Sequence, residues 1–137
     1  MFSSRSLDCK TPYGAAAAGE TVTFSLYPRR EQSVQRAALW VERDGGEPRR
    51  LDMRWFGLSG ARDRYSVTFT PETPGLYWYY FTIETPDGPR CCARGYGGRG
   101  ELMDAPEEKF QLTVYDPASR APAWFGEGIT YNIFPDR

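Results

Sequence analysis

The chain has 137 residues, about the size of one domain with a sizeable core. Its 17 basic residues nearly balance its 18 acidic ones, so the formal net charge of −1 provides no field to attract nucleic acid or an anionic membrane. Aromatic residues make up 15% of the sequence, which favours a β-rich, aromatic-packed interior or a ligand-binding face.

The cysteine and histidine content limits the chemistry further. Cys91 and Cys92 are adjacent and Cys9 is distant, so free thiols in a reducing compartment are expected rather than a disulfide scaffold or a metal site. The absence of histidine removes the commonest general base and every Ser-His or Cys-His nucleophile arrangement. Residues 1–8 lack the pattern of a signal peptide, and no apolar run reaches membrane-spanning length. We therefore expect a cytoplasmic location and no cofactor.

The beginning of the chain predicts one clear strand. Residues 1–19 are expected to form an N-terminal extension, and the four alanines of Ala15–Ala18 are too few for a stable helix. From Thr21 the sequence alternates, with Val22, Phe24 and Leu26 on one face, until Pro28 ends the strand.

The next segment predicts a hairpin. Arg36–Arg43 alternates in the same way and runs into Asp44–Gly46, whose glycines favour a tight turn. Arg50–Phe56 is then expected as the returning strand, with Leu51, Met53 and Trp55 on one side. Gly57–Asp63 is predicted to be a loop.

Four further strands are predicted in the second half. Arg64–Phe69 alternates up to Pro71, and Leu76–Glu84 is the most aromatic stretch of the chain. The Asp87-Gly88 pair indicates a hairpin into the segment that contains Cys91 and Cys92, Gly95–Gly100 is a glycine-rich loop, and Lys109–Tyr115 is the last strand.

These elements predict an all-β fold. About seven short strands with turn signals between them are typical of an immunoglobulin-like antiparallel β-sandwich. The module is expected over residues 20–116. Residues 117–137 begin as a linker, because Pro117 and Pro122 interrupt any regular element.

The last residues carry a resemblance. Trp124 lies in the linker, and Ile129, Tyr131 and Ile133 then alternate before Pro135 in Tyr131-Asn132-Ile133-Phe134-Pro135-Asp136-Arg137. This segment resembles the first barrel strand of the α-amylase family (glycoside hydrolase family 13), with Asn132 where the family usually has Gln. The resemblance implies a domain that precedes a catalytic barrel and a chain that ends as the barrel begins.

The sandwich itself is also similar to known modules. Gly75–Phe81, which follows Pro71 and Pro74, looks like a late strand of the amino-terminal modules of neopullulanase and pullulanase, and Leu39–Val41 and Gln111–Asp116 fit the same modules. The resemblance implies a non-catalytic module that binds or orients α-glucan chains beside its own barrel, because the family's catalytic carboxylates lie on later strands. The alternative is a structural or homodimerisation domain that shapes the active site of the parent enzyme without binding sugar alone. A calcium ion would belong to the parent enzyme.

Aromatic side chains are the candidate binding residues, because sugar rings stack their C–H faces on Trp and Tyr. Period-two geometry places Tyr77, Tyr79, Phe81 and Ile83 in the core, and it points Trp78 and Tyr80 outward. Trp40 joins them if its strand is adjacent, as would Trp55 or Tyr27. The competing interpretation for Trp78 and Tyr80 is burial against the barrel or a second subunit, while Trp124 and Phe125 are expected to wedge the linker.

Overall fold

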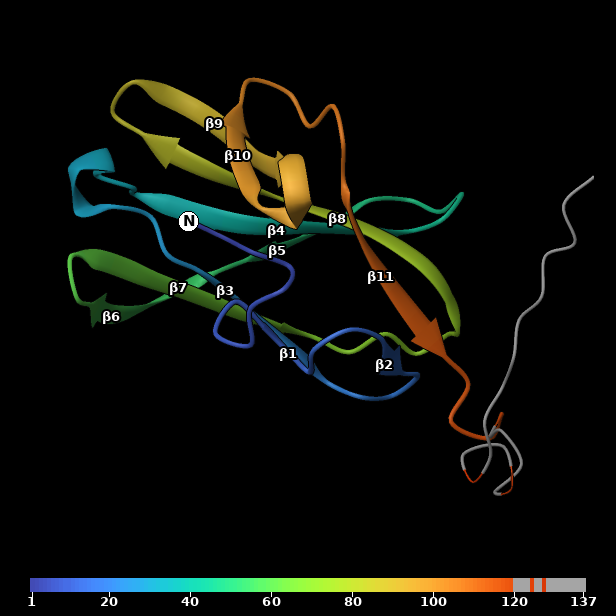
Figure 1. Ribbon diagram of the computed structural model, residues 1–137. Coiled ribbons are helices and arrows are strands. Elements are labelled where there is room, and N and C mark those ends of the chain that lie inside the picture. Colours follow the sequence, from blue (N-terminus) through green and yellow to red (C-terminus); the bar gives the residue numbers. More distant parts are fainter. Residues whose placement is uncertain (120–123, 125–126, 128–137) are drawn as a thin grey trace, which may run out of the picture.

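The computed structural model describes residues 1–119, 124 and 127. Over this part of the chain it consists of eleven β-strands in two facing sheets, with short 3-10 turns at Arg30–Gln32 and Tyr96–Gly98 and no α-helix (Figure 1). The all-β sandwich predicted from the sequence is confirmed. Among the described residues, no helix is long and apolar enough to cross a membrane.

The smaller sheet has four strands in the order β1-β3-β7-β6. Their bounds are Lys10–Thr11 for β1, Val22–Leu26 for β3, Arg62–Phe69 for β7 and Arg54–Ser59 for β6. Each neighbouring pair is antiparallel. β6 therefore lies at one edge of this sheet.

The larger sheet is built around β8, the longest strand, Gly75–Thr85. β4 (Arg36–Arg43) pairs along one side of β8, and β5 (Arg49–Asp52) pairs with β4 beyond it. On the other side, β9 (Gly88–Arg94) pairs with the second half of β8 and β11 (Phe110–Tyr115) pairs with the first half. β10 (Gly100–Met103) pairs antiparallel with β9, and β2 (Ala16–Ala17) pairs parallel with β11.

The core between the sheets is aromatic. Tyr77, Tyr79, Phe81 and Ile83 of β8 are all buried, as their alternation predicts. The ring of Phe24, from β3, packs 4.8 Å from that of Tyr79, which joins the smaller sheet to the larger. The inward face of β8 is thus fixed, and the alternate residues of the same strand face away from the core.

The hairpin predicted after β4 is wrong in its second half. Arg50–Phe56 is not one strand: β5 ends at Asp52, and the chain then crosses to the smaller sheet as β6. Met53 marks the crossing, since its side chain is buried and its backbone N–H donates to the carbonyl of Ala37 at 2.9 Å. Trp55 therefore belongs to a different sheet from Leu51.

The loop predicted over Gly57–Asp63 is mostly strand. β6 continues to Ser59 and β7 begins at Arg62, so the connection is short. The register between β6 and β7 shifts between Trp55 and Leu58, where Gly57 has a φ of 103° that side chains rarely adopt. A glycine that indicated a loop is in fact the bulge of an edge strand.

The start of the chain packs into the sandwich. Phe2 is buried, and its ring lies 4.6 Å from that of Phe81 and 4.9 Å from that of Phe110. Ala16–Ala17, within the alanine run, forms β2. The module boundary at residue 20 stays a prediction, but residues before it contribute to both sheets and to the core.

The segment Gly95–Gly100 contains a 3-10 turn and leads into a strand that the sequence did not predict. β10 begins at Gly100 and pairs with β9. A side chain at Gly100 would place its Cβ 2.6 Å from the Cys92 Sγ, so the close approach requires glycine. Trp124 is exposed, and the barrel strand predicted at residues 129–133, the ring of Phe125 and that of Tyr131 lie outside the described residues.

Candidate carbohydrate-binding face

Three aromatic residues from neighbouring strands lie on the outer face of the larger sheet. Trp78 and Tyr80 alternate with the buried residues of β8, and both are half-buried. The antiparallel register of β4 and β8 sets Trp40 directly opposite Tyr80. Residues that pair in this way point to the same face, so the structure brings together the three residues predicted from the sequence. We call Trp40, Trp78 and Tyr80 the aromatic face.

The rings of this face are held in place by contacts with their neighbours. The Trp40 and Tyr80 ring planes differ by 3°, and their centroids are 6.1 Å apart. The Trp40 Nε1–H donates to Thr82 Oγ1 at 3.2 Å, and the Trp78 Nε1–H donates to Asp44 Oδ1 at 2.8 Å. A ligand that stacks on these rings therefore meets side chains that have little conformational freedom left to lose.

A row of polar side chains runs across the strands at Tyr80. The Lys109 ammonium lies 5.8 Å from the centre of the Tyr80 ring and forms an ion pair of 2.6 Å with Glu42, which itself pairs with Trp78 in the register. On the far side, Arg50 of β5 lies opposite Trp40. The two aromatic rings thus lie between two cations, Lys109 beside Tyr80 and Arg50 beside Trp40. Both can donate hydrogen bonds to hydroxyl groups.

Trp78 has polar neighbours of its own. Gln111 of β11 lies opposite it on one side, and Glu42 of β4 lies opposite it on the other. An amide and a carboxylate offer both donors and acceptors beside an apolar ring. This combination suits a sugar, whose faces are apolar and whose rim carries hydroxyl groups.

The phenol of Tyr80 stays protonated at neutral pH. Burial raises the pKa of Tyr80 above its ordinary value, and the neighbouring Cys91 and Glu42 act in the same direction, whereas Lys109 opposes them. The hydroxyl group therefore remains a hydrogen-bond donor throughout the range in which a sugar ligand would be tested.

Two further candidates do not join the aromatic face. Trp55 lies on β6 of the smaller sheet, and Tyr27 follows β3, where its hydroxyl donates to the carbonyl of Asp8. The flanking residues Lys109, Glu42 and Arg50 were missed. Their own sequence segments carry no signal for them, because only the order and register of the strands place them beside the rings.

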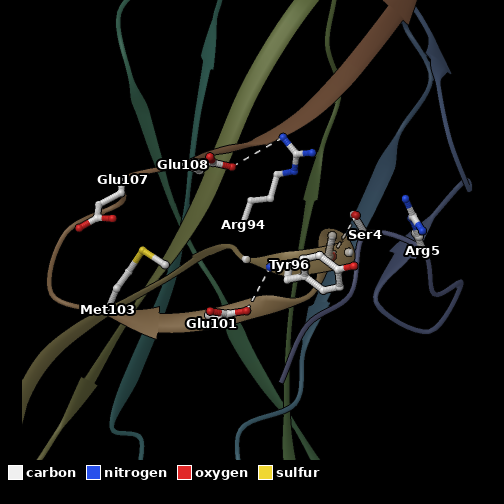
Figure 2. A pocket seen from close by; sticks show the side chains of 11 residues that line it. Ser4, Arg5, Arg94, Tyr96, Glu101, Met103, Glu107 and Glu108 are labelled. Carbon is white, nitrogen blue, oxygen red and sulfur yellow. Dashed lines mark hydrogen bonds and ion pairs between the residues drawn. The ribbon is translucent and has the colours of Figure 1, made fainter.

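A hollow elsewhere on the surface suits a sugar less well than the aromatic face does. It measures about 920 Å³ and lies beside the turn at Tyr96–Gly98 (Figure 2). Most of its side chains are charged, and three of them already have partners. Arg94 lies 3.8 Å from Glu108, and Glu101 accepts a hydrogen bond from the backbone of Tyr96. The ring of Tyr96 is exposed, and it contacts no other aromatic ring among the described residues.

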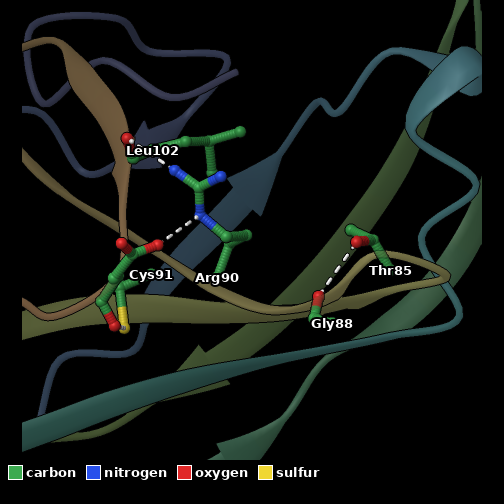
Figure 3. Close-up of polar contacts among 6 residues, drawn as sticks. Thr85, Gly88, Arg90, Cys91 and Leu102 are labelled. Carbon is green, nitrogen blue, oxygen red and sulfur yellow. Dashed lines mark hydrogen bonds and ion pairs between the residues drawn. The ribbon is translucent and has the colours of Figure 1, made fainter.

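The cysteine pair shows no sign of reactivity. The Arg90 guanidinium lies 3.2 Å from the carboxylate of Asp104 and donates to the carbonyl of Leu102 at 3.3 Å. The bond to Leu102 ties β9 to β10 beside Cys91 (Figure 3). Burial raises the pKa of the Cys91 thiol, so little thiolate forms near neutrality. Within residues 1–119, 124 and 127, no group of three Cys, Asp or Glu side chains is placed to hold a metal ion.

Similarity to known proteins extends over nearly the whole chain. No family model matches the chain. The chain is 28% identical to an amylopullulanase of Thermoanaerobacter thermohydrosulfuricus over 138 aligned positions. It is 29% identical to an amylopullulanase of Thermoanaerobacterium saccharolyticum over 136 aligned positions. Each match covers 93% of this chain. Over nearly its whole length, this chain is similar to a part of these amylopullulanases.

The resemblance to enzymes of the α-amylase family is thereby confirmed. The chain spans only 9% and 10% of the length of these two relatives. In three dimensions it matches a cyclomaltodextrinase with a TM-score of 0.58 and 18% sequence identity, over 90% of this chain and 21% of that structure. The chain is thus a β-sandwich that is similar in sequence to a small part of much longer amylopullulanases and in fold to a part of a cyclomaltodextrinase.

Proposed function

We propose that this chain is a non-catalytic, amino-terminal module that binds α-glucan chains through Trp40, Trp78 and Tyr80 and so holds them near the catalytic barrel of its parent enzyme. The observation that carries the proposal is the aromatic face. It sets three rings from two adjacent strands on the outer side of the larger sheet, with charged and amide groups around them. The names of the relatives, amylopullulanase and cyclomaltodextrinase, favour an α-glucan as the ligand.

The expected affinity is modest. Stacking on two rings with a few solvent-exposed hydrogen bonds corresponds to about 4–6 kcal/mol of binding free energy, or a Kd of about a millimolar to tens of micromolar. Such binding is useful because it raises the effective concentration of a polymer near an active site in the same protein. The free thiols of Cys9, Cys91 and Cys92 support a reducing compartment for the enzyme.

The test is a titration of the 137-residue chain with maltoheptaose, followed by tryptophan fluorescence. A saturable change is expected, and the β-linked cellotetraose serves as the control that should produce none. Trp78→Ala should weaken binding roughly tenfold, because a stacked ring and its covered area contribute about 1–2 kcal/mol. The far-ultraviolet circular dichroism of the variant should stay unchanged, since Trp78 lies outside the core.

Two results would count against the proposal. A Kd of about ten millimolar is the weakest affinity worth proposing. No response at about that concentration of maltoheptaose would therefore reject sugar binding by this chain. Unfolding of Trp78→Ala would show instead that the ring is structural.

A second candidate function is a docking or dimerisation role that shapes the parent's active site. It is favoured by the edge strand β6, where Phe56 is 63% exposed and Leu58 is 55% exposed. Unpaired edge strands with exposed apolar residues are surfaces that other chains can cover. Sedimentation velocity over a range of concentrations would detect self-association, and Leu58→Glu should abolish it. A monomer at every concentration would contradict dimerisation by this chain.

A further inference from the structure

The aromatic face continues toward the edge of the larger sheet. Arg50 of β5 lies opposite Trp40, and Asp52, two residues further along the same strand, lies opposite Ala38. Side chains two residues apart on a strand share a face, so Arg50 and Asp52 extend the surface that carries Trp40. They form an ion pair of 3.0 Å, and Asp52 is largely exposed.

A hollow lies beyond this ion pair, where the chain crosses between the sheets. It measures about 380 Å³, and its lining includes Arg50, Asp52, Arg36 and the ring of Trp55. Met53, which is buried and whose backbone N–H donates to the carbonyl of Ala37, also lines the hollow and fixes the crossing. The hollow is therefore small, and residues of both sheets line it.

Trp55 has the features of a stacking residue. Its side chain is 57% exposed, and its Nε1–H donates to Asp63 Oδ1 on β7 at 2.9 Å, which fixes the orientation of the ring. An exposed ring with a satisfied N–H leaves its apolar surface as the part available to a ligand. Beside it, the guanidinium of Arg50 and the carboxylate of Asp52 provide donors and acceptors for adjacent hydroxyl groups.

We propose that Trp55, Arg50 and Asp52 form a second sugar-binding site that takes a later stretch of the same α-glucan chain after it leaves the aromatic face. The proposal rests on the proposed function, because the first site is the aromatic face. The two sites meet at Arg50, which lies beside Trp40 in the register and also lines the hollow beside Trp55. A chain that reaches both sites gains affinity through the linked second contact, whereas a disaccharide does not.

The chain provides a matched control for Trp55. Phe56 is the next residue on β6, is exposed to a similar extent and points into a different hollow, with Arg54 and Arg64. Its ring contacts the Arg64 guanidinium at 5.9 Å. Asp52 also lines this hollow, but replacing Phe56 removes an equally exposed aromatic side chain from the same strand and leaves Trp55, Arg50 and Asp52 in place.

The experiment compares Trp55→Ala with Phe56→Ala by calorimetric titration of maltose and maltoheptaose into the 137-residue chain. Trp55→Ala should weaken maltoheptaose binding about three- to tenfold and leave maltose binding unchanged. Phe56→Ala should change neither. Equal maltoheptaose affinities for the wild type and Trp55→Ala would overturn the second site. If Trp55→Ala also changed the sedimentation mass of the protein, Trp55 would instead belong to a surface for self-association.

Nuclear magnetic resonance separates this failure from a failure of the proposed function. The chain has four tryptophans, whose indole N–H signals can be assigned from single Trp→Phe variants. Shifts at Trp40, Trp78 and Trp55 with maltoheptaose would support both sites. Shifts at Trp40 and Trp78 alone would overturn the second site and keep the first, and no shift at any of the three would reject the proposed function itself.

Discussion

Adjacent residues on β8 have opposite roles. Tyr80 faces outward beside Trp40, whereas Tyr79 is fully buried among the rings of Phe24 and Phe110. The Tyr79 hydroxyl has no hydrogen-bond partner among the described residues, and burial raises the pKa of Tyr79 far above its usual value. An unsatisfied buried hydroxyl destabilises the folded state.

Tyr79→Phe is therefore expected to stabilise the protein. Removing the hydroxyl should raise the free energy of unfolding by about 1 kcal/mol, because it abolishes the cost of burying an unpaired polar group. Urea unfolding followed by circular dichroism would measure this change. Tyr77→Phe is the matched control: it should lower stability by about 1 kcal/mol, because the Tyr77 hydroxyl donates to the carbonyl of Thr73 at 2.8 Å. Loss of stability in Tyr79→Phe would reveal a partner for its hydroxyl.

Cys92 should make stability fall at alkaline pH. Burial raises the pKa of Cys92 from 9.0 to about 12, and the charges of Cys9 and Cys91 add to this, while the amino group of Met1 opposes it. Between pH 9 and about 12 the unfolded chain loses the thiol proton and the folded chain keeps it, so the unfolded state binds fewer protons and stability falls as pH rises. The slope from one such group is about 1.4 kcal/mol per pH unit.

Urea unfolding between pH 8 and pH 10.5 would measure this slope. Cys92→Ala is expected to be less stable at pH 8, because it leaves a small cavity, but its stability should depend less on pH above 9. Identical slopes for the two proteins would show that Cys92 does not titrate differently in the folded and unfolded states.

At the scale of elements, the sequence predicted strands best where alternation is strong. β8 and β4 could be predicted because their large apolar residues alternate, although Ala38 on the outer face of β4 is also buried. The outward direction of Trp78, Tyr80 and Trp40 followed from this alternation. The division of Arg50–Phe56 between two sheets could not be predicted, because alternation continues through Met53. Pairing partners lie far apart in the sequence, so the flanks Lys109 and Arg50 appear only once the register is known.

The short strands escaped prediction for a different reason. β10 begins with a glycine and has only four residues, and β2 is two alanines, so neither carries a hydrophobic pattern of its own. Their neighbours impose the strand conformation. Gly100 is the clearest case, because its missing side chain lets β10 approach Cys92.

Gly100→Ala is expected to destabilise the protein by about 1–3 kcal/mol, since its Cβ would meet the Cys92 Sγ at 2.6 Å and Phe2 Cβ at 3.2 Å, in a core that cannot easily give way. A double-mutant cycle with Cys92→Ala tests the mechanism, because removal of the sulfur makes room for the new methyl group. The double variant should be more stable than the sum of the single effects predicts, by at least about 0.5 kcal/mol. Strict additivity would mean that the sulfur is not what excludes a side chain.

At the scale of the molecule, the start of the chain connects the two sheets. The Met1 carbonyl accepts a hydrogen bond from the backbone of Tyr27, next to β3, and the Phe2 carbonyl accepts one from Gly100 at the start of β10. Between these bonds the Phe2 ring packs on Phe81 and Phe110. The first residues thus bridge the two sheets and complete the core between them. The aromatic face, on the outside of the larger sheet, depends on this core.

Phe2→Ala is therefore expected to cost far more stability than its position near the end of the chain would indicate. Removal of a buried ring that contacts three others should lower the free energy of unfolding by about 3–5 kcal/mol, a large fraction of the total for a domain of this size. Leu7→Ala, whose side chain is 63% exposed, should change it by less than about 0.5 kcal/mol. The measurement is the urea midpoint of each variant. Below its unfolding transition Phe2→Ala should still bind maltoheptaose as the wild type does, because Phe2 lies on the inner side of the sheet that carries Trp78. A midpoint for Phe2→Ala equal to that of the wild type would show that the first residues do not contribute to the core in solution.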